Sequence, residues 1–350
     1  MNTAARNLKQ LVYSLALPHG RMVGTKGHAD AKAFLLDQFK TRRFAPYPEE
    51  SFEIPYTRDQ VRFTNLIGVV PGRNRRKKPV LIGAHYDSVI DAPCADDNAA
   101  AVAIALGVGS RLMESPPERD TIIAIFDAEE PPHYETDSMG SIRFYADQMQ
   151  PPGVHAAVIM DLVGHDIEVP VSLIPGTPVN RFPSLQSQGI PIPRLRNLLF
   201  MTGAESHPAL GSIVESTLIP SGLLPMLTPN RNVGDVSDHG VFRRNGVPYL
   251  FLSCGRWQHY HAPTDTPDRL NYAKVARIAK YVEGLVRILS ESELPESSAD
   301  ETDTAEVEIR YLKKVCGPFF PVGLRMIGMD RLEGRDDLDE LAGKLLQMGL

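Results

Sequence analysis

The fold is constrained most by short apolar segments that alternate with helical patterns along the first 290 residues. Apolar runs of strand length cover residues 64–70, 79–85, 121–130, 154–164 and 246–255. Helical patterns cover residues 27–42, 98–115 and 271–290. Buried strands that alternate with helices are typical of α/β proteins. We therefore predict a three-layer α/β sandwich, with helices on both faces of a mixed, largely parallel central sheet.

Composition and charge argue against two classes of protein. The chain has 350 residues, 43% hydrophobic and 23% charged, which is typical of a globular protein. A net charge of −6 gives no electrostatic footprint for nucleic acid, and no apolar run approaches the roughly 18 residues of a membrane span. The basic run at residues 72–78 lies between two apolar stretches, so we interpret it as the exposed turn of a hairpin. Binding of a polyanion is the alternative for this run.

The N-terminal segment and the cysteines bear on localisation. Three cysteines are too few for a disulfide framework. The apolar segment at residues 11–18 is short and lacks a small-residue cleavage site, while Leu8, Leu11, Val12 and Leu15 fit helical spacing. We expect an N-terminal helix in a cytoplasmic protein, or in an exported one if a signal has been removed. The oligomeric state is left open, with a homo-oligomer as one alternative.

The composition changes sharply after residue 290. Residues 290–308 hold eight acidic residues and no basic residue, which is typical of a solvated linker. We predict a main domain at 1–290, an acidic linker at 291–308 and a C-terminal extension of unknown role at 309–350. Within the main domain, residues 165–196 are rich in proline and lack periodicity, so we expect a loop there.

Histidines and acids follow the apolar runs at the points where the runs end. His85 ends one run, Glu129 and Glu130 end the next, and Asp161 follows a third. His261 lies a few residues beyond the run at 246–255. A single histidine or acid at such a point is usually a hydrogen-bonded or solvated side chain. Because ligands collect at the carboxyl ends of the strands in open α/β sheets, the whole set indicates one functional site.

Two further aspartates lie close to this set in the sequence. Asp97 stands beside Asp96 at the start of the helix predicted at 98–115, and adjacent carboxylates are stabilised when cations lie between them. Asp87 points to the same side of its strand as His85, so it could accept a hydrogen bond from the ring nitrogen that is not on a metal. Alternatively, Asp87 caps the following loop. A mixed set of histidines and carboxylates suits Zn²⁺, with Mn²⁺ or Co²⁺ as alternatives.

Six separated motifs then carry a resemblance to a known family. They are "GAHYDSV", "ADDNAAAVA", "FDAEE" with a later "MGS", "VIMDLVG", "SDHGVF" and "YHAPTDT". In this order they resemble the M28 family of zinc peptidases, which includes bacterial and vacuolar aminopeptidases. The resemblance covers roughly residues 20 to 290, so it makes the main domain the catalytic domain.

The resemblance implies a role for each site residue. It places two zinc ions in the site, with His85 and Asp161 on one ion, Glu130 and His261 on the other, and Asp97 between them. It also implies a cis peptide between Asp97 and Asn98, and a place for Asp238 beside the ligands. It makes Glu129 the general base, and we count Asp87, which would orient a ligand, with Glu129 as the catalytic residues.

The implied activity is hydrolysis of peptides. A dizinc-activated water would attack the scissile carbonyl while Glu129 removes its proton. A free α-amino group would find acids and metal in such a pocket, which favours the removal of N-terminal residues. The resemblance therefore implies a zinc metallo-aminopeptidase with a peptide substrate.

Two departures from the family pattern and the filled ligand positions bear on the alternatives. The nine-residue loop at 131–139 is long, as in glutaminyl cyclases, which share the fold and use one zinc, but Tyr260 stands where those enzymes usually carry tryptophan. Cys94 puts a thiol beside the site, as a small buried filler or as a redox-sensitive group. A non-catalytic binding module would lack a ligand or the base, whereas all these positions are filled. A serine hydrolase is not indicated, since no Gly-x-Ser-x-Gly elbow is present.

Overall fold

The computed structural model of the chain describes most of its residues. The exceptions are residues 1, 48–49, 171–188, 191–194, 296–301 and 348–350. Most of the loop predicted at 165–196 therefore lies outside the described residues. Within the described part of the chain, no helix has both the length and the apolar character needed to cross a membrane.

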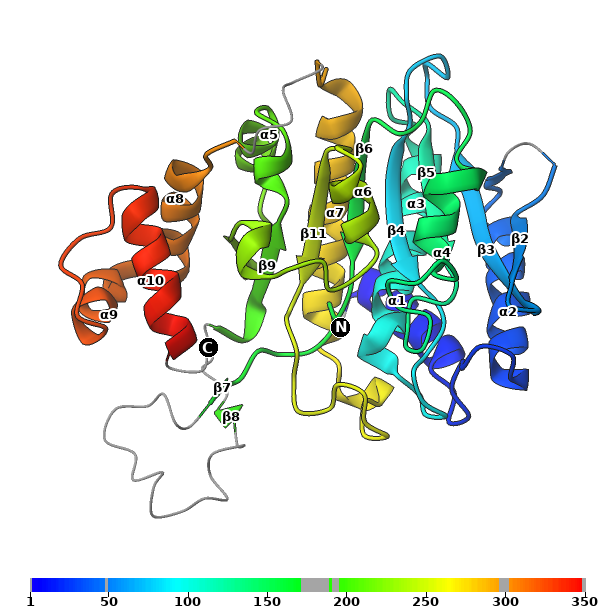
Figure 1. The fold of residues 1–350 in the computed structure, drawn as a ribbon, viewed down its shortest axis with the longest axis horizontal. Coiled ribbons are helices and arrows are strands. Elements are labelled where there is room, and N and C mark those ends of the chain that lie inside the picture. Colours follow the sequence, from blue (N-terminus) through cyan, green and yellow to red (C-terminus); the bar gives the residue numbers. More distant parts are fainter. Residues whose placement is uncertain (1, 48–49, 171–188, 191–194, 296–301, 348–350) are drawn as a thin grey trace.

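A mixed nine-stranded sheet forms the centre of the molecule (Figure 1). Its strands are β1 (Ala45–Pro46), β2 (Glu53–Arg58), β3 (Val61–Val70), β4 (Val80–His85), β5 (Thr121–Phe126), β6 (Ala156–Met160), β9 (Leu198–Thr202), β10 (Leu224–Leu227) and β11 (Tyr249–Ser253). The main order is β1-β3-β5-β4-β6-β11-β9-β10, and β2 also pairs with β3. The four central strands β5, β4, β6 and β11 run parallel, whereas β3 and β9 are antiparallel to their central neighbours. A small separate pair joins β7 (Val169–Pro170) to β8 (Gly189–Ile190).

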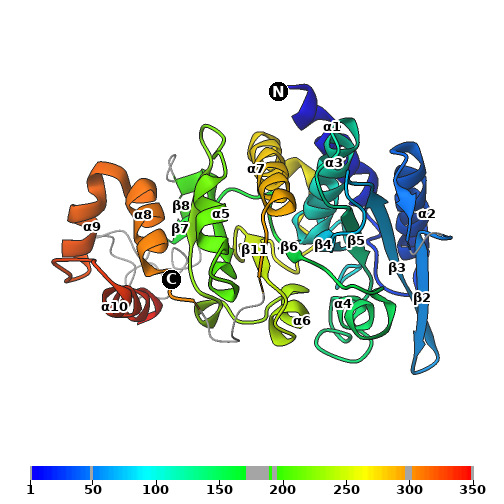
Figure 2. The ribbon, with the colours of Figure 1, turned by 90° about the horizontal axis from the view of Figure 1, so that it is seen from above.

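Helices cover both faces of this sheet (Figure 2). One face carries α1 (Thr3–Leu15), α2 (Lys26–Thr41), α3 (Ala100–Glu114), α5 (Leu210–Ser216) and α7 (Tyr272–Glu291). The other face carries α4 (Gly140–Arg143), the π-helical turn that follows it (Phe144–Gln148) and α6 (His239–Arg244). The side chains on the two faces of the sheet belong to two different hydrophobic clusters. The predicted three-layer α/β sandwich is confirmed, and so is the N-terminal helix.

The amino-acid pattern explains why the central layer is so apolar. All residues of β4, β5 and β6 are buried, because parallel strands between two helix layers have no solvent-exposed face. Each fully buried Val, Leu or Ile contributes about 1.5–3 kcal/mol relative to an exposed one. The small residues of α3 let that helix approach the sheet closely: a Cβ on Gly109 would lie 2.5 Å from the ring of Phe44.

The prediction of a hairpin around residues 72–78 is wrong. β3 and β4 both pair with β5 and not with each other, so this segment crosses over the end of β5. Apolar alternation marks where strands occur, but it does not say which strand is inserted between two others. The basic run faces acids rather than a free polyanion site, since Arg75 pairs with Asp120 and Lys77 with Glu293.

Three C-terminal helices lie beyond the far edge of the sheet, and the first of them packs on it. They are α8 (Ala305–Cys316), α9 (Phe320–Met326) and α10 (Arg335–Gln347), drawn in orange and red in Figure 1. α8 packs along the edge strand β10 and begins inside the segment predicted as a linker. The hydroxyl of Tyr311 on α8 donates to the carbonyl of Val214 at 3.0 Å. Covering an edge strand removes unpaired backbone groups on which another chain could pair.

Candidate metal centre

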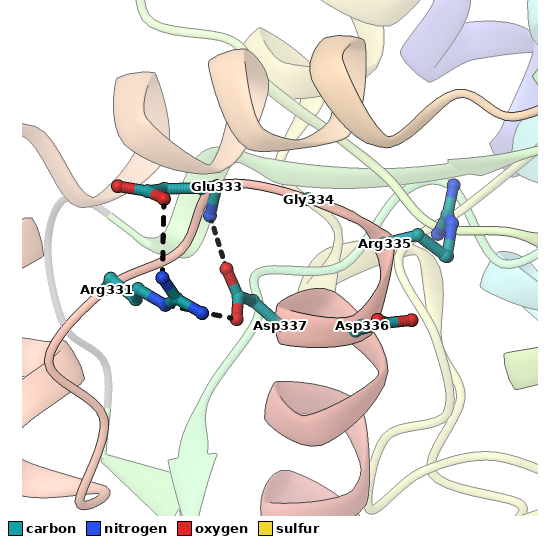
Figure 3. A pocket seen from close by; sticks show the side chains of 6 residues that line it. All are labelled: Arg331, Glu333, Gly334, Arg335, Asp336 and Asp337. Carbon is teal, nitrogen blue, oxygen red and sulfur yellow. Dashed lines mark hydrogen bonds and ion pairs between the residues drawn. The ribbon is translucent and has the colours of Figure 1, made fainter.

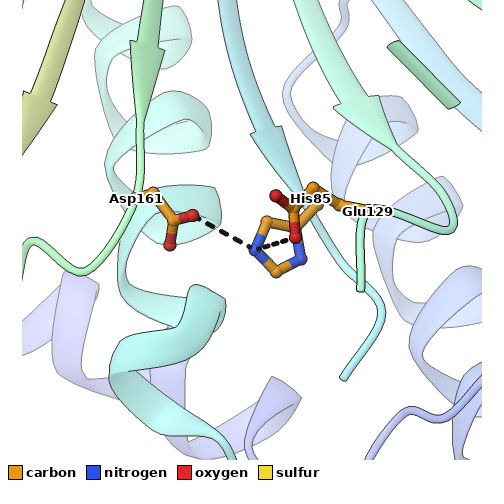
Figure 4. Close-up of side chains that lie close together, drawn as sticks. All are labelled: His85, Glu129 and Asp161. Atoms are coloured by element: carbon orange, nitrogen blue, oxygen red, sulfur yellow. Dashed lines mark ion pairs between the residues drawn. The ribbon is translucent and has the colours of Figure 1, made fainter. Parts of the chain in front are cut away.

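Three neighbouring parallel strands bring the first site residues together. His85 is the last residue of β4, Glu129 and Glu130 follow β5, and Asp161 directly follows β6. Because β4 lies between β5 and β6, the acids flank His85 from both sides (Figure 4). The Nε2 atom of His85 lies 3.7 Å from Asp161 Oδ2 and 3.7 Å from Glu129 Oε2.

An irregular turn before α3 brings Asp97 into the same place. Residues Ala95–Ala99 form a π-helical turn in which Asp97 and Asn98 have non-helical backbone angles. The peptide between these two residues is cis, as the family resemblance predicts. The side-chain amide of Asn98 donates to the carbonyl of Met160 at 2.9 Å, which ties the turn to the end of β6. The side chain of Asp97 therefore points toward the end of the sheet, and the regular helix begins only after this turn.

The two oxygens of Asp97 face two different histidines. Asp97 Oδ1 lies 3.4 Å from His85 Nε2, and Asp97 Oδ2 lies 3.3 Å from His261 Nε2. His261 comes from the long loop after β11, and its Nε2 is also 3.2 Å from Glu130 Oε2. The structure thus brings all five predicted metal ligands into one cluster, with Asp97 between the two histidines.

The buried polar atoms of this cluster fit a divalent cation. Each of the five residues has one such atom without a hydrogen-bond partner among the described residues: His85 Nε2, Asp97 Oδ2, Glu130 Oε1, Asp161 Oδ1 and His261 Nε2, and His85 Nδ1 on the far side of the ring has none either. A buried polar atom without a partner costs about 1–3 kcal/mol, and more for a charged group. Ligand atoms of His85, Asp97 and Glu130 lie within 4.8 Å of one another, and so do those of His85, Glu129 and Asp161. Imidazole nitrogens and carboxylate oxygens in a buried cluster are the donor set that zinc takes.

Burial and mutual repulsion shift the pKa values of the acids in the cluster. Burial raises the pKa of Glu129 well above its ordinary value, and it raises the pKa of Glu130 to about 8, with a further contribution from the charge of Asp97. Burial would also raise the pKa of Asp97, but the adjacent imidazoles of His261 and His85 outweigh it and lower this pKa. Burial tends to lower the pKa of His261, yet Asp97 and Glu130 raise it to about 9. Without a cation, protons have to balance the charge of this site.

Asp87 makes more contacts than the sequence predicted. Its Oδ1 lies 3.4 Å from His85 Nδ1, which is the ring nitrogen facing away from the cluster. The same carboxylate accepts the backbone N–H groups of Glu129 at 3.1 Å and Glu130 at 3.0 Å. Asp87 therefore fixes one histidine and two acids at once. These contacts argue against the alternative that Asp87 caps the loop that follows it.

Two contributors to the site escaped the sequence analysis. Asp265 is fully buried, and its carboxylate accepts the backbone N–H groups of Asp96 and Asp97 at 2.9–3.1 Å. Arg21 is also buried, and its guanidinium lies under the turn that carries Asp97. Asp265 stands in the quoted motif "YHAPTDT", so the motif itself was a signal for it. Arg21 gave no signal, because its partners are backbone carbonyls, which every residue has.

The rim of the site is formed by loops from both sides. The ring of Tyr260 stacks on the ring of His261 with centroids 3.7 Å apart, and the guanidinium of Arg256 lies 5.0 Å over Tyr260. The hydroxyl of Tyr134, in the loop 131–139 after Glu130, donates to the carbonyl of Asp235. Cys94 is buried beside Arg21, and burial raises its pKa to about 12, so its thiol is protonated at neutral pH.

A separate hollow of about 360 Å³ lies at the start of α10 (Figure 3). Its lining is charged, and the charges pair locally: Arg331 lies 3.8 Å from both Glu333 and Asp337. Asp337 also accepts the backbone N–H of Glu333 at 2.7 Å. No residue of the histidine and carboxylate cluster lines this hollow, so we assign the chemistry to the cluster.

Comparison with known proteins gives the class of this chain. Residues 65–286, more than half of the chain, match the model of peptidase family M28, so the chain belongs to this family of hydrolases. The uncharacterised protein YfbL of Escherichia coli is 28% identical over 236 residues, which cover 61% of this chain and 67% of YfbL. The suspected family is therefore confirmed, and peptides are the substrates that it implies.

Solved structures share the fold. A glutaminyl cyclase of Bacteroides thetaiotaomicron covers 81% of this chain and 97% of its own, with a TM-score of 0.59 and 16% identity. A zinc-dependent exopeptidase of Parabacteroides distasonis covers the same shares, 81% and 97%, with a TM-score of 0.58 and 16% identity. At such low identity the likeness concerns the fold.

Proposed function

We propose that this protein is a dizinc aminopeptidase, in which Asp97 is shared between two zinc ions. The observation that carries this proposal is the position of Asp97, whose two oxygens lie 3.4 Å and 3.3 Å from different histidines. His85 and Asp161 would hold one ion, and Glu130 and His261 the other. Two ions that share a carboxylate are a recurring arrangement in hydrolases. The zinc-dependent exopeptidase with the same fold supports the choice of metal.

The chain supplies a base beside this centre. Bound zinc would polarise the scissile carbonyl and lower the pKa of the attacking water. Glu129 would take a proton from that water and deliver it to the leaving amine, as a general base and then a general acid. Its position suits this role, since it is buried and its carboxylate lies within 4.8 Å of ligand atoms of both His85 and Asp161. Asp87 would keep Glu129 in place through the backbone of the 129–130 segment.

The acidic surroundings favour a substrate with a free amine. The α-amino group of a peptide is a cation near neutral pH, and a buried group of carboxylates attracts it more strongly than an amide. This argument favours removal of N-terminal residues over cleavage within a chain.

Metal counting and a substrate panel test the proposal together. The purified protein would be stripped with chelator, reloaded with zinc and analysed for metal per chain. Leucyl and glutaminyl aminoacyl chromogenic substrates, and an N-acetylated leucyl control, would be assayed before and after reloading. We expect two zinc ions per chain, turnover of the leucyl substrate and none of the acetylated one. One ion per chain, or equal cleavage of the acetylated substrate, would contradict the proposal.

Glutaminyl cyclisation is the second candidate, because a glutaminyl cyclase shares the fold over most of the chain. It would require one metal ion and release ammonia from N-terminal glutamine without cutting the peptide bond. The same panel separates the two if ammonia is measured beside the chromophore, since the cyclase would release ammonia from the glutaminyl substrate and no chromophore from either substrate. The contact of Asp97 with two histidines favours the peptidase.

We also infer how the chain divides. Residues 1–290 would form the catalytic unit, residues 291–308 would connect it to the end of the chain, and residues 309–350 would be an extension packed on the sheet edge. The buried contacts of α8 with β10 support a fixed rather than a mobile extension.

A further inference from the structure

Arg21 lies at the centre of an unusual set of contacts. The residue is 1% exposed. Its guanidinium donates to backbone carbonyls of Tyr86 (2.7 Å), Leu15 (3.2 Å), Pro93 (2.7 Å), Cys94 (2.9 Å) and Asp97 (3.3 Å). All of these acceptors are neutral carbonyls. A buried arginine usually pairs with a carboxylate, so this one is used to hold backbone in place.

The contacts join the two segments that carry His85 and Asp97. Tyr86 follows His85 directly, and Pro93, Cys94 and Asp97 belong to the loop and turn that bring the shared carboxylate into the cluster. One planar group therefore fixes the end of β4 relative to the turn before α3. The distance between the two metal ligands depends on that relative position.

The backbone of the same segment adds further contacts. The backbone N–H of Arg21 donates to Ser88 Oγ at 2.7 Å, and the N–H of Ser88 returns a bond to the carbonyl of Arg21 at 3.3 Å. Gly20 has φ +58°, and a Cβ there would lie 2.6 Å from the carbonyl oxygen of Ile90. The chain before α2 is thus packed directly against the loop between the two ligands. This segment precedes residues 65–286, the part that matches the family model.

We propose that Arg21 is a positioning residue that sets the affinity of the site for zinc, by holding Asp97 at the distance from His85 that a shared ion requires. This inference rests on the proposed metal centre. Lysine keeps the positive charge but has no planar fork, so it reaches fewer of these carbonyls. Loss of residues that orient metal ligands typically weakens metal binding about 10–100-fold.

The test is zinc affinity of the full chain, measured by competition with a chelating indicator. For Arg21→Lys we expect a Kd for zinc about 10–100-fold higher than for the wild type. Unfolding by urea in excess chelator would be measured in parallel, to show that the variant is folded without metal. Arg119→Lys is the control: Arg119 is also buried and donates to the carbonyls of Lys78 and Ser292 and to the carboxylate of Glu293, but it precedes β5, at the other end of the sheet. It should change stability and leave zinc affinity unchanged.

The outcomes separate this inference from the proposed function. A folded Arg21→Lys variant with wild-type zinc affinity overturns the positioning role, and so does an equal loss in Arg119→Lys. A wild-type protein that binds no zinc overturns the metal centre itself. If Arg21→Lys does not fold, Ser88→Ala tests the same contacts more gently, because it removes one hydrogen bond to the Arg21 backbone. We expect zinc affinity about twofold to tenfold weaker in that variant, and unchanged affinity overturns the inference.

Discussion

Asp96 and Asp97 are adjacent in the chain, yet their carboxylates face different histidines in different environments. Asp97 lies between His85 and His261 in the metal-ligand cluster. Asp96 turns away from it, and its Oδ2 lies 2.6 Å from Nδ1 of His165, which stacks on Trp257. The irregular backbone of the turn makes this divergence possible, because adjacent residues of a regular helix point only about 100° apart.

This divergence explains how two neighbouring acids are tolerated in a buried place. Asp96 is compensated by His165 and by the backbone N–H of Gly164, so it needs no cation. Oδ2 of Asp97 has no such partner among the described residues, so this atom is available to bind a metal. The adjacent carboxylates are thus one structural residue and one proposed ligand.

Replacing Glu129 with glutamine should separate catalysis from metal binding. The amide is isosteric but has no basic oxygen for the proton, so we expect kcat to fall about 10²–10⁴-fold. Zinc content, measured by elemental analysis, should remain at the wild-type value. A variant that loses zinc would make Glu129 a ligand, and a fully active variant would exclude it as the base.

Replacing His261 with alanine should release one zinc ion per chain. This histidine contacts only one side of the shared carboxylate, together with Glu130, so the ion beside His85 should keep its other ligands. The nearby His259 is a matched control, because its Nδ1 pairs with Thr264 and not with the acids. Equal zinc content in both alanine variants would argue against His261 as a ligand.

Asp265 should stabilise the fold independently of metal. Replacement by alanine leaves the buried N–H groups of Asp96 and Asp97 without an acceptor, at about 1–3 kcal/mol each. We therefore expect the free energy of unfolding to drop by about 2–6 kcal/mol in urea titrations carried out in chelator. Asp265→Asn keeps one acceptor oxygen and should lose less. An alanine variant as stable as the wild type would show that these bonds contribute little.

His239 should make the fold sensitive to acid. Burial lowers its pKa to about 4 in the folded state, while the unfolded chain keeps a value near 6.5. As the pH falls below 6.5, the unfolded state takes up the proton first, so stability that is present above pH 6.5 is lost toward pH 4. The total effect is about 3 kcal/mol.

The His239→Gln variant isolates this effect, since glutamine does not titrate. Its difference in unfolding free energy from the wild type should be largest at pH 7 and shrink steadily down to pH 4. Other titrating groups are common to both proteins and cancel in the comparison. A difference that is constant with pH would show that His239 titrates normally in the folded state.

Arg335 should anchor the C-terminal helices. It makes a two-pronged pair with Glu308, at 2.7 Å and 3.1 Å, and that carboxylate is only 3% exposed. Removing one partner of a buried pair costs about 3–5 kcal/mol, so Arg335→Ala should lower stability strongly. Arg331→Ala is the control, because its acidic neighbours lie at 3.8 Å on the exposed rim of the hollow in Figure 3. We expect it to change stability by less than about 1 kcal/mol.

The order of the elements and the place of the site could be predicted from the sequence. Apolar runs of five to ten residues and the small-residue pattern of α3 depend on local chemistry, and they reappear at nearly the expected bounds. The site could be located because the parallel strands end on one side of the sheet, so His85 and Asp161 had to lie near each other. This argument needs no knowledge of the loops.

Other features were decided only by the tertiary structure. The insertion of β5 between β3 and β4, the divergence of Asp96 from Asp97, and the contacts of Arg21 have no local signature. The Arg21 side chain reaches a carbonyl 65 residues away, and backbone carbonyls are the same in every residue. Side-chain types and their spacing determined the layers and the candidate ligands of this protein. Which groups those side chains finally touch was decided by packing, because a contact between distant segments exists only once both are in place.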